Sequence, residues 1–247
     1  MVKRSVALKA ATGINPKGVY APKNQAPMTR MGIANILRNF LQDSKDYRDK
    51  KIENKDCKEK LPEFNLALEN GMKVINREIP LKVHTYIHDI MTVLEIAKEF
   101  DIDVTIDHGL GSSNYYEELT DSHIKGVIMG PICAPLFPGE GGILDIEACK
   151  GLDDRGVLVS VITDGPVTKQ GLLVLQAGEA VRKGMDPDRA LAMLTINAAK
   201  MLMCDDRIGS IEEGKDADIL IFDSMPTENP GSVMETVIID GEIVYKI

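Results

Sequence analysis

The sequence contains no tryptophan, and aromatic side chains make up only 4% of its 247 residues. So few rings argue against a stacking surface for single-stranded nucleic acid or for sugars. A net charge of −9 also makes nucleic acid and anionic membranes poor partners. No apolar run approaches the roughly 18 residues of a membrane-spanning helix, and no secretory hydrophobic stretch follows Met1. These absences predict a globular protein that binds neither nucleic acid nor membranes.

Cysteine is scarce, and none of the four residues forms a C-x-x-C pair: Cys57, Cys133, Cys149 and Cys204. Scattered single cysteines in a chain of this length predict reduced thiols in a cytoplasmic protein, not a disulfide framework.

Five short apolar segments alternate with helical patterns, which predicts an α/β fold with a parallel sheet. The predicted strands are residues 5–10, 81–84, 104–108, 126–129 and 157–163. Thr29 and Asp89 are predicted to cap helices, and Pro62 is predicted to open another. The mixed charges of residues 43–60 predict a solvated helix end and an exposed loop.

The tail has a different pattern, with strands predicted at residues 217–222, 233–239 and 242–247 and a hairpin turn at Asp240-Gly241. We therefore expect two parts, an α/β body at 1–208 and a β appendage at 209–247. Five parallel strands are too few for a complete eight-stranded barrel.

Three residues that can bind metal follow predicted strands. His84 and His108 end two strands, and Asp164 comes just after a third. Because the ends of parallel strands share one edge, these side chains could meet there and bind Zn²⁺ or a similar ion. The alternative is that each is an isolated polar residue at a strand end.

Three further residues have weaker signals. Lys9 is either a surface lysine or, if desolvated, a carbamate that bridges two metal ions. His88 is a candidate pocket residue, whereas Asp107 requires no special role.

Several motifs resemble the amidohydrolase superfamily, in its imidazolonepropionase-like branch. Residues 207–219 (RIGSIEEGKDADI) and 194–200 (LTINAAK) resemble its closing signature. Residues 162–166 (ITDGP) resemble its eighth-strand aspartate motif, and 80–84 (PLKVH) and 106–109 (IDHG) its fifth- and sixth-strand histidine motifs. Residues 13–17 (GINPK) and 29–32 (TRMG) resemble the branch.

The resemblance implies a (β/α)₈ barrel with a small β-sandwich, and hydrolysis of the C–N bond of a small-molecule amide or cyclic amide. It implies one or two divalent ions, with zinc the first choice, bound by His84, His108 and Asp164. Asp164 would also act on the attacking water, and Lys9 would carry the bridging carbamate.

The first-strand His-x-His pair of these enzymes is absent from the sequence, which leads us to expect the C-terminal portion of a longer protein. A complementing N-terminal chain or a homo-oligomer would then cover the open barrel. Two alternatives to an active enzyme remain. One is a truncated remnant or subunit that acts as a binding or assembly module, and the other is an α/β protein that binds a sugar or phosphate.

Overall fold

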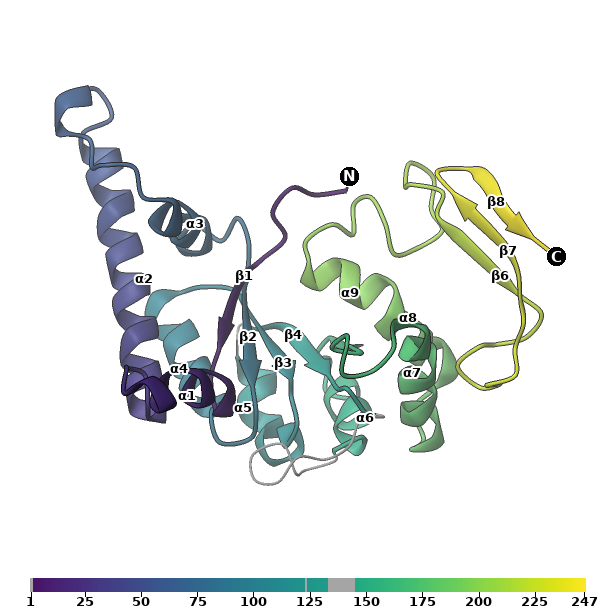
Figure 1. Ribbon diagram of the computed structural model, residues 1–247. Helices are drawn as coiled ribbons and strands as arrows, with labels where there is room; N and C mark the ends of the chain where they lie inside the picture. Colours follow the sequence, from purple (N-terminus) through teal and green to yellow (C-terminus); the bar gives the residue numbers. More distant parts are fainter. Residues whose placement is uncertain (1, 123, 133–144) are drawn as a thin grey trace.

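The computed structural model describes residues 2–122, 124–132 and 145–247 (Figure 1), so Cys133 lies outside the described residues. Its main sheet has five parallel strands, as predicted. They are β1 (Leu8–Ala11), β2 (Leu81–Thr85), β3 (Val104–His108), β4 (Ile124–Met129) and β5 (Val159–Val161).

The strands lie in the sheet in the same order as in the chain, β1 to β5. An order that never reverses is that of a (β/α) barrel, whereas a doubly wound sheet reverses at a switch point. In the described part of the chain, β1 and β5 each pair with one strand only. The sheet is therefore an open arc, which confirms the predicted incomplete barrel.

Alternate residues of the strands face different surroundings. Val83 and Ile106 are fully buried and belong to the core that the sheet forms with its helices. Lys82, His84 and Asp107 alternate with them and so point to the other face of the sheet. The helix-facing side is thus apolar, and the inner face of the arc carries the polar residues.

Nine α-helices are described. They are α1 (Ile14–Tyr20), α2 (Arg30–Glu53), α3 (Leu66–Ile75), α4 (Ile90–Phe100), α5 (Tyr116–Asp121), α6 (Glu147–Asp153), α7 (Leu173–Arg182), α8 (Pro187–Leu194) and α9 (Ile196–Met201). Short 3₁₀ helices occupy Ala21–Lys23, Lys58–Lys60, Ser112–Tyr115 and Gln170–Leu172. None of the described helices is both long enough and apolar enough to cross a bilayer.

Helix α2 is longer than the charged segment led us to expect. Thr29 caps its start, as predicted, by accepting a hydrogen bond from the Gly32 amide at 3.1 Å. The helix then continues to Glu53, so much of the charged segment is helical, and its far end projects from the molecule (Figure 1).

One predicted helix start is corrected, and a second is confirmed in position but lacks the predicted capping bond. Helix α3 begins at Leu66, not Pro62, because the Asn65 side chain accepts hydrogen bonds from two amides of the first turn. Asp89 precedes α4 but its side chain makes no capping bond; its carboxylate lies 3.3 Å from Arg30 instead.

The tail forms the predicted antiparallel sheet of β6 (Ile219–Phe222), β7 (Met234–Ile239) and β8 (Glu242–Lys246). Asp240 and Gly241 both have positive φ, 51° and 80°, as a tight hairpin turn requires. All five residues of β8 are exposed, so this strand presents its side chains to solvent on both faces.

Candidate functional site

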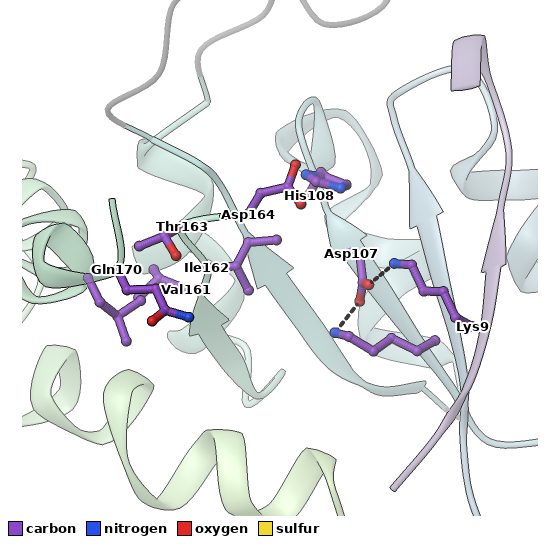
Figure 2. A pocket seen from close by; sticks show the side chains of 10 residues that line it. Lys9, Asp107, His108, Val161, Ile162, Thr163, Asp164 and Gln170 are labelled. Carbon is purple, nitrogen blue, oxygen red and sulfur yellow. Dashed lines mark hydrogen bonds and ion pairs between the residues drawn. The ribbon is translucent and has the colours of Figure 1, made fainter. Parts of the chain in front are cut away.

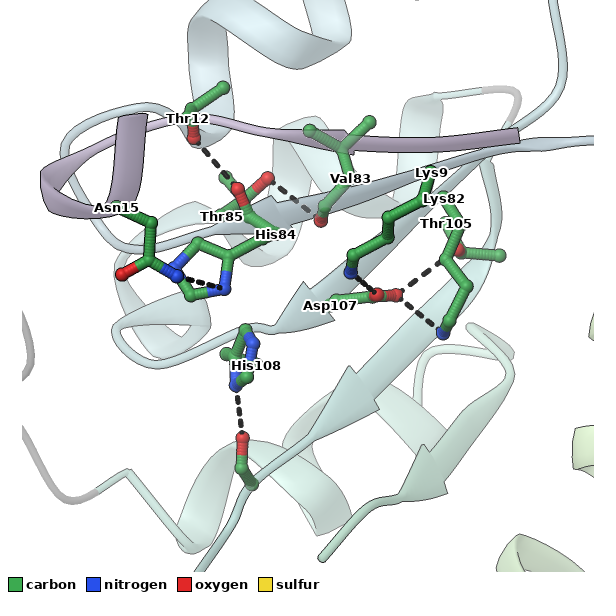
Figure 3. A network of polar contacts seen from close by, with 11 residues as sticks. Lys9, Thr12, Asn15, Lys82, Val83, His84, Thr85, Thr105, Asp107 and His108 are labelled. Atoms are coloured by element: carbon green, nitrogen blue, oxygen red, sulfur yellow. Dashed lines mark hydrogen bonds and ion pairs between the residues drawn. The ribbon is translucent and has the colours of Figure 1, made fainter. Parts of the chain in front are cut away.

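The two strand-end histidines lie side by side. His84 on β2 and His108 on β3 have ring centroids 4.2 Å apart with the planes at 65°. Both side chains are buried, since the residues are only 5% and 3% exposed. The two strands are parallel neighbours in which His84 lies opposite Asp107 and Thr85 opposite His108, so the two histidines are offset by one residue, and Figure 3 shows them close together.

A backbone carbonyl fixes the orientation of His108. Its Nδ1 lies 2.7 Å from the carbonyl oxygen of Gly130, which can only accept, so Nδ1 carries the proton and donates. Burial lowers the pKa of His108 by more than Gly130 and the Asp164 carboxylate raise it. The ring is therefore neutral at pH 7 and keeps a lone pair on Nε2.

Two residues that the sequence analysis did not assign surround the pair. The Tyr86 ring packs against both imidazoles, with centroids 4.8 Å from His84 and 5.5 Å from His108. The side-chain nitrogen of Asn15, in α1, lies 3.4 Å from Nδ1 of His84. The GINPK motif, which contains Asn15, was the available signal for this contact.

Asp164 and His108 line the same cavity of about 560 Å³ (Figure 2). Asp164 follows β5 and is an exposed residue, and it interacts electrostatically with His108. His88, by contrast, is exposed in the turn after β2 and does not line this cavity. The structure thus brings His108 together with Asp164 in the cavity and places His84 against His108, although His84 itself does not line this cavity.

The backbone is strained at both cavity residues. His108 and Asp164 have φ values of 71° and 49°, in the left-handed region that residues with a side chain rarely occupy. Such a conformation costs on the order of 1–3 kcal/mol and is often found at functional sites.

The structure corrects the prediction that Asp107 has no special role. Its side chain is 2% exposed and accepts from Lys9 at 2.5 Å, from Lys82 at 2.8 Å and from Thr105 at 3.3 Å. Lys9 is thus paired as an ammonium with a side chain that is 56% exposed. A carbamate requires a neutral, desolvated amine, which this pairing does not provide.

The fit of these residues to a divalent ion can be judged from their chemistry. Two buried imidazoles side by side, one with its Nε2 lone pair fixed, are suitable ligands for zinc. Among the described residues, however, no three His, Cys, Asp or Glu side chains gather into a metal-binding group. The histidine pair fits an ion, and Asp164 is the nearby carboxylate that could complete the set.

A family model and several curated proteins are similar to this chain. Residues 49–244 match the amidohydrolase family. The chain is 26% identical to amidohydrolase tasK of Hapsidospora irregularis over 95% of this chain and 25% of that protein. It is 28% identical to the imidazolonepropionase of Fusobacterium nucleatum over 68% of this chain and 40% of that protein.

A solved structure is similar over nearly the whole chain. The crystal structure of an amidohydrolase from Thermotoga maritima superposes with a TM-score of 0.91 at 36% identity, covering 98% of this chain and 63% of that one. The chain therefore spans less than two thirds of this relative and a quarter to two fifths of the two curated relatives.

Proposed function

This chain belongs to the amidohydrolase family, and from that premise we propose that it carries the site of a metal-dependent hydrolase acting on C–N bonds other than peptide bonds. The observation that supports the proposal is the 4.2 Å between the rings of His84 and His108, beside the cavity that Asp164 lines. The substrate would be a small-molecule amide or cyclic amide.

In this proposal His84, His108 and Asp164 hold one divalent ion, with zinc the expected metal because its usual ligands are imidazole and carboxylate. When bound, such an ion supplies Lewis acidity, which polarises a carbonyl and makes water a better nucleophile. Lys9 is not required, because its Nζ would have to leave Asp107 and lose its proton to form a carbamate.

The chain's own residues would orient the site, transfer the protons and exclude water. His108 is held by Gly130 in the tautomer that presents Nε2, so its ring needs no reorientation. The Asp164 carboxylate would accept the proton of the attacking water as general base and then deliver it to the leaving nitrogen. The buried face of the site, with Tyr86 against both rings, would limit the entry of other water.

Metal analysis of the purified chain tests this proposal. We expect near-stoichiometric zinc after purification without chelators, and its loss in His84→Ala and His108→Ala variants. His88→Ala is the matched control, since this histidine is exposed, whereas His84 and His108 are buried with their rings side by side. Asp164→Asn should lower metal content or hydrolysis. If it changes neither, a binding protein for sugar or phosphate is favoured, and a metal-free wild type favours a remnant.

A second candidate function, an assembly module, is favoured by the open arc. Within the described residues β1 and β5 are edge strands, and unpaired edges are templates for further strands. Strand β8 also exposes large apolar residues, with Ile243 at 62% and Val244 at 57%. The partner would be a polypeptide that adds parallel strands between β5 and β1, or a second copy of this chain.

Sedimentation of the chain by itself tests self-association. A concentration-dependent dimer that Val244→Lys dissociates would support pairing through β8. A monomer at all concentrations would exclude the homo-oligomer and leave a complementing polypeptide as the proposed partner.

A further inference from the structure

The turn after β4 connects the candidate site to a fully buried glutamine. Gly130, in this turn, binds His108 through both of its backbone groups. Its amide donates to the His108 carbonyl oxygen at 3.2 Å, and its carbonyl accepts from Nδ1 of the ring at 2.7 Å (Figure 3). Two residues further on, the Ile132 amide donates to Oε1 of Gln176 at 2.5 Å. The site histidine and the glutamine thus bind the same short segment at its two ends.

Gln176 is a polar residue in an apolar position. It lies on the buried face of α7 together with Ala177 and Ala180. Its Oε1 must be the atom that faces the Ile132 amide, because that N–H can only donate. Its Nε2 has no hydrogen-bond partner in the described part of the chain. An apolar side chain would leave no buried donor unpaired here, so the bond to Ile132 is what the glutamine adds.

The turn is closely confined by its neighbours. Gly130 has a φ of 115°, and a Cβ at this residue would lie 2.8 Å from the Ile162 carbonyl oxygen and 2.9 Å from Oε1 of Gln176. The amide oxygen therefore lies close to the Gly130 backbone while it binds the next residue but one. Ile132 is only 5% exposed, so without this oxygen its N–H would be buried and unpaired. The turn would then have to shift to reach another acceptor.

We propose that Gln176 is a positioning residue for the candidate metal site. It holds residues 130–132 so that the Gly130 carbonyl keeps the His108 proton on Nδ1, which leaves the Nε2 lone pair free for an ion. Gln176 does not line the cavity of His108 and Asp164, so it acts through Gly130 and not by contact with a ligand. The role at the metal site rests on the proposed hydrolase function, whereas the control of the tautomer does not.

Nitrogen-15 NMR of the full chain with labelled histidine tests the inference. The chemical shifts of Nδ1 and Nε2 show which of them carries the proton, and His108→Gln identifies the His108 signals. At about pH 8, with zinc removed by a chelator, the neutral ring of the wild type should carry its proton on Nδ1. Gln176→Met keeps the length of the side chain but replaces the amide with a thioether, a weak acceptor. This variant should show a mixture of the two tautomers.

Two matched variants separate positioning from a general loss of stability. Gln176→Glu keeps an oxygen for the Ile132 amide and loses only a donor that has no partner, so it should retain the wild-type tautomer. Asn197→Leu removes another buried side-chain amide, which donates to the Val159 carbonyl at 2.9 Å. It should destabilise the chain in urea unfolding, as Gln176→Met does, and leave the His108 tautomer unchanged.

Zinc affinity is the second measurement, made by competition with a chelating indicator. Gln176→Met should bind zinc about tenfold more weakly than the wild type, at the lower end of the loss typical for residues that orient a ligand histidine. Gln176→Glu and Asn197→Leu should bind it as the wild type does.

An Nδ1 proton that persists in Gln176→Met, or an Nε2 proton in the wild type, overturns the inference. An equal change of tautomer in Asn197→Leu also overturns it, because the effect would then be one of stability. A mixture in Gln176→Glu counts against it as well, since the acceptor is still present. Unchanged zinc affinity in Gln176→Met removes the role at the metal site. If the wild type binds no zinc but the tautomers respond as expected, the hydrolase proposal fails and the positioning of His108 stands.

Discussion

Asp107→Asn is the substitution whose effect on stability can be worked out most directly. The change keeps the size of the side chain and an oxygen for Thr105, but it removes the charge that both lysines contact. Lys9 is 56% exposed and loses little, since exposed ion pairs are worth about 0–1 kcal/mol. Lys82 is 26% exposed, and breaking a buried pair costs about 3–5 kcal/mol, which its partial exposure reduces. We expect the free energy of unfolding to fall by about 2–3 kcal/mol.

Urea unfolding at pH 7, followed by circular dichroism, measures this loss. Asp101→Asn is the control, because Asp101 is 83% exposed and its pair with Arg77 should contribute less than about 0.5 kcal/mol. In a Lys82→Met background, Asp107→Asn should lower the free energy of unfolding by less, because the main partner of Asp107 has already been removed. A loss below about 0.5 kcal/mol, or one that is unchanged in that background, would refute the reasoning.

Three other predictions follow from the site and its packing. Burial lowers the pKa of His108 below its usual 6.5 in the folded protein. As the pH drops, this imidazole is therefore protonated in the unfolded chain before it is protonated in the folded one. The free energy of unfolding should then fall as pH drops below about 6.5. In His108→Gln the free energy of unfolding should depend less on pH, as measured by urea titrations at several pH values. An unchanged pH dependence would contradict this prediction. Gly71→Ala should lower the free energy of unfolding by about 1–3 kcal/mol in urea, because the added Cβ would lie 2.0 Å from Oγ of Ser44. Gly18→Ala is the control and should not lower it, because no atom lies near the position of its Cβ. Chelation of zinc should lower the melting temperature of the wild type but not of His84→Ala; equal shifts in both would exclude His84 as a ligand.

The sequence predicted the sheet well because its strands are short, apolar and separated by helices. A buried strand such as β3 is covered on both faces of the sheet, so its residues must fit between two packed layers. This requirement concerns only a few consecutive residues, so it can be recognised in the sequence. The start of α2 could also be predicted from the local sequence, because Thr29 caps the helix through the Gly32 amide of its first turn. The far end of α2 was mispredicted because α2 packs against α3, a tertiary contact that overrides the charge pattern. The start of α3 was mispredicted because Asn65, not Pro62, supplies the capping side chain.

The site was only partly accessible from sequence. His84, His108 and Asp164 could be selected because strand ends share an edge, but the pairing of two lysines with Asp107 depends on cross-strand register. Lys9 and Lys82 are paired partners in the sheet, while Asp107 lies two residues beyond the partner of Lys82 on β3. Nothing along the chain reveals that these three side chains meet.

The left-handed backbone at His108 and Asp164 has a consequence for how the chain could be stabilised. Glycine would occupy both conformations without steric penalty, so a design that optimised folding alone would replace these two residues early. Doing so would remove an imidazole and a carboxylate from the same cavity. At these two positions the chain has reactive side chains although glycine would give a less strained backbone. A substitution that raises thermostability here would therefore remove groups that the proposed chemistry needs.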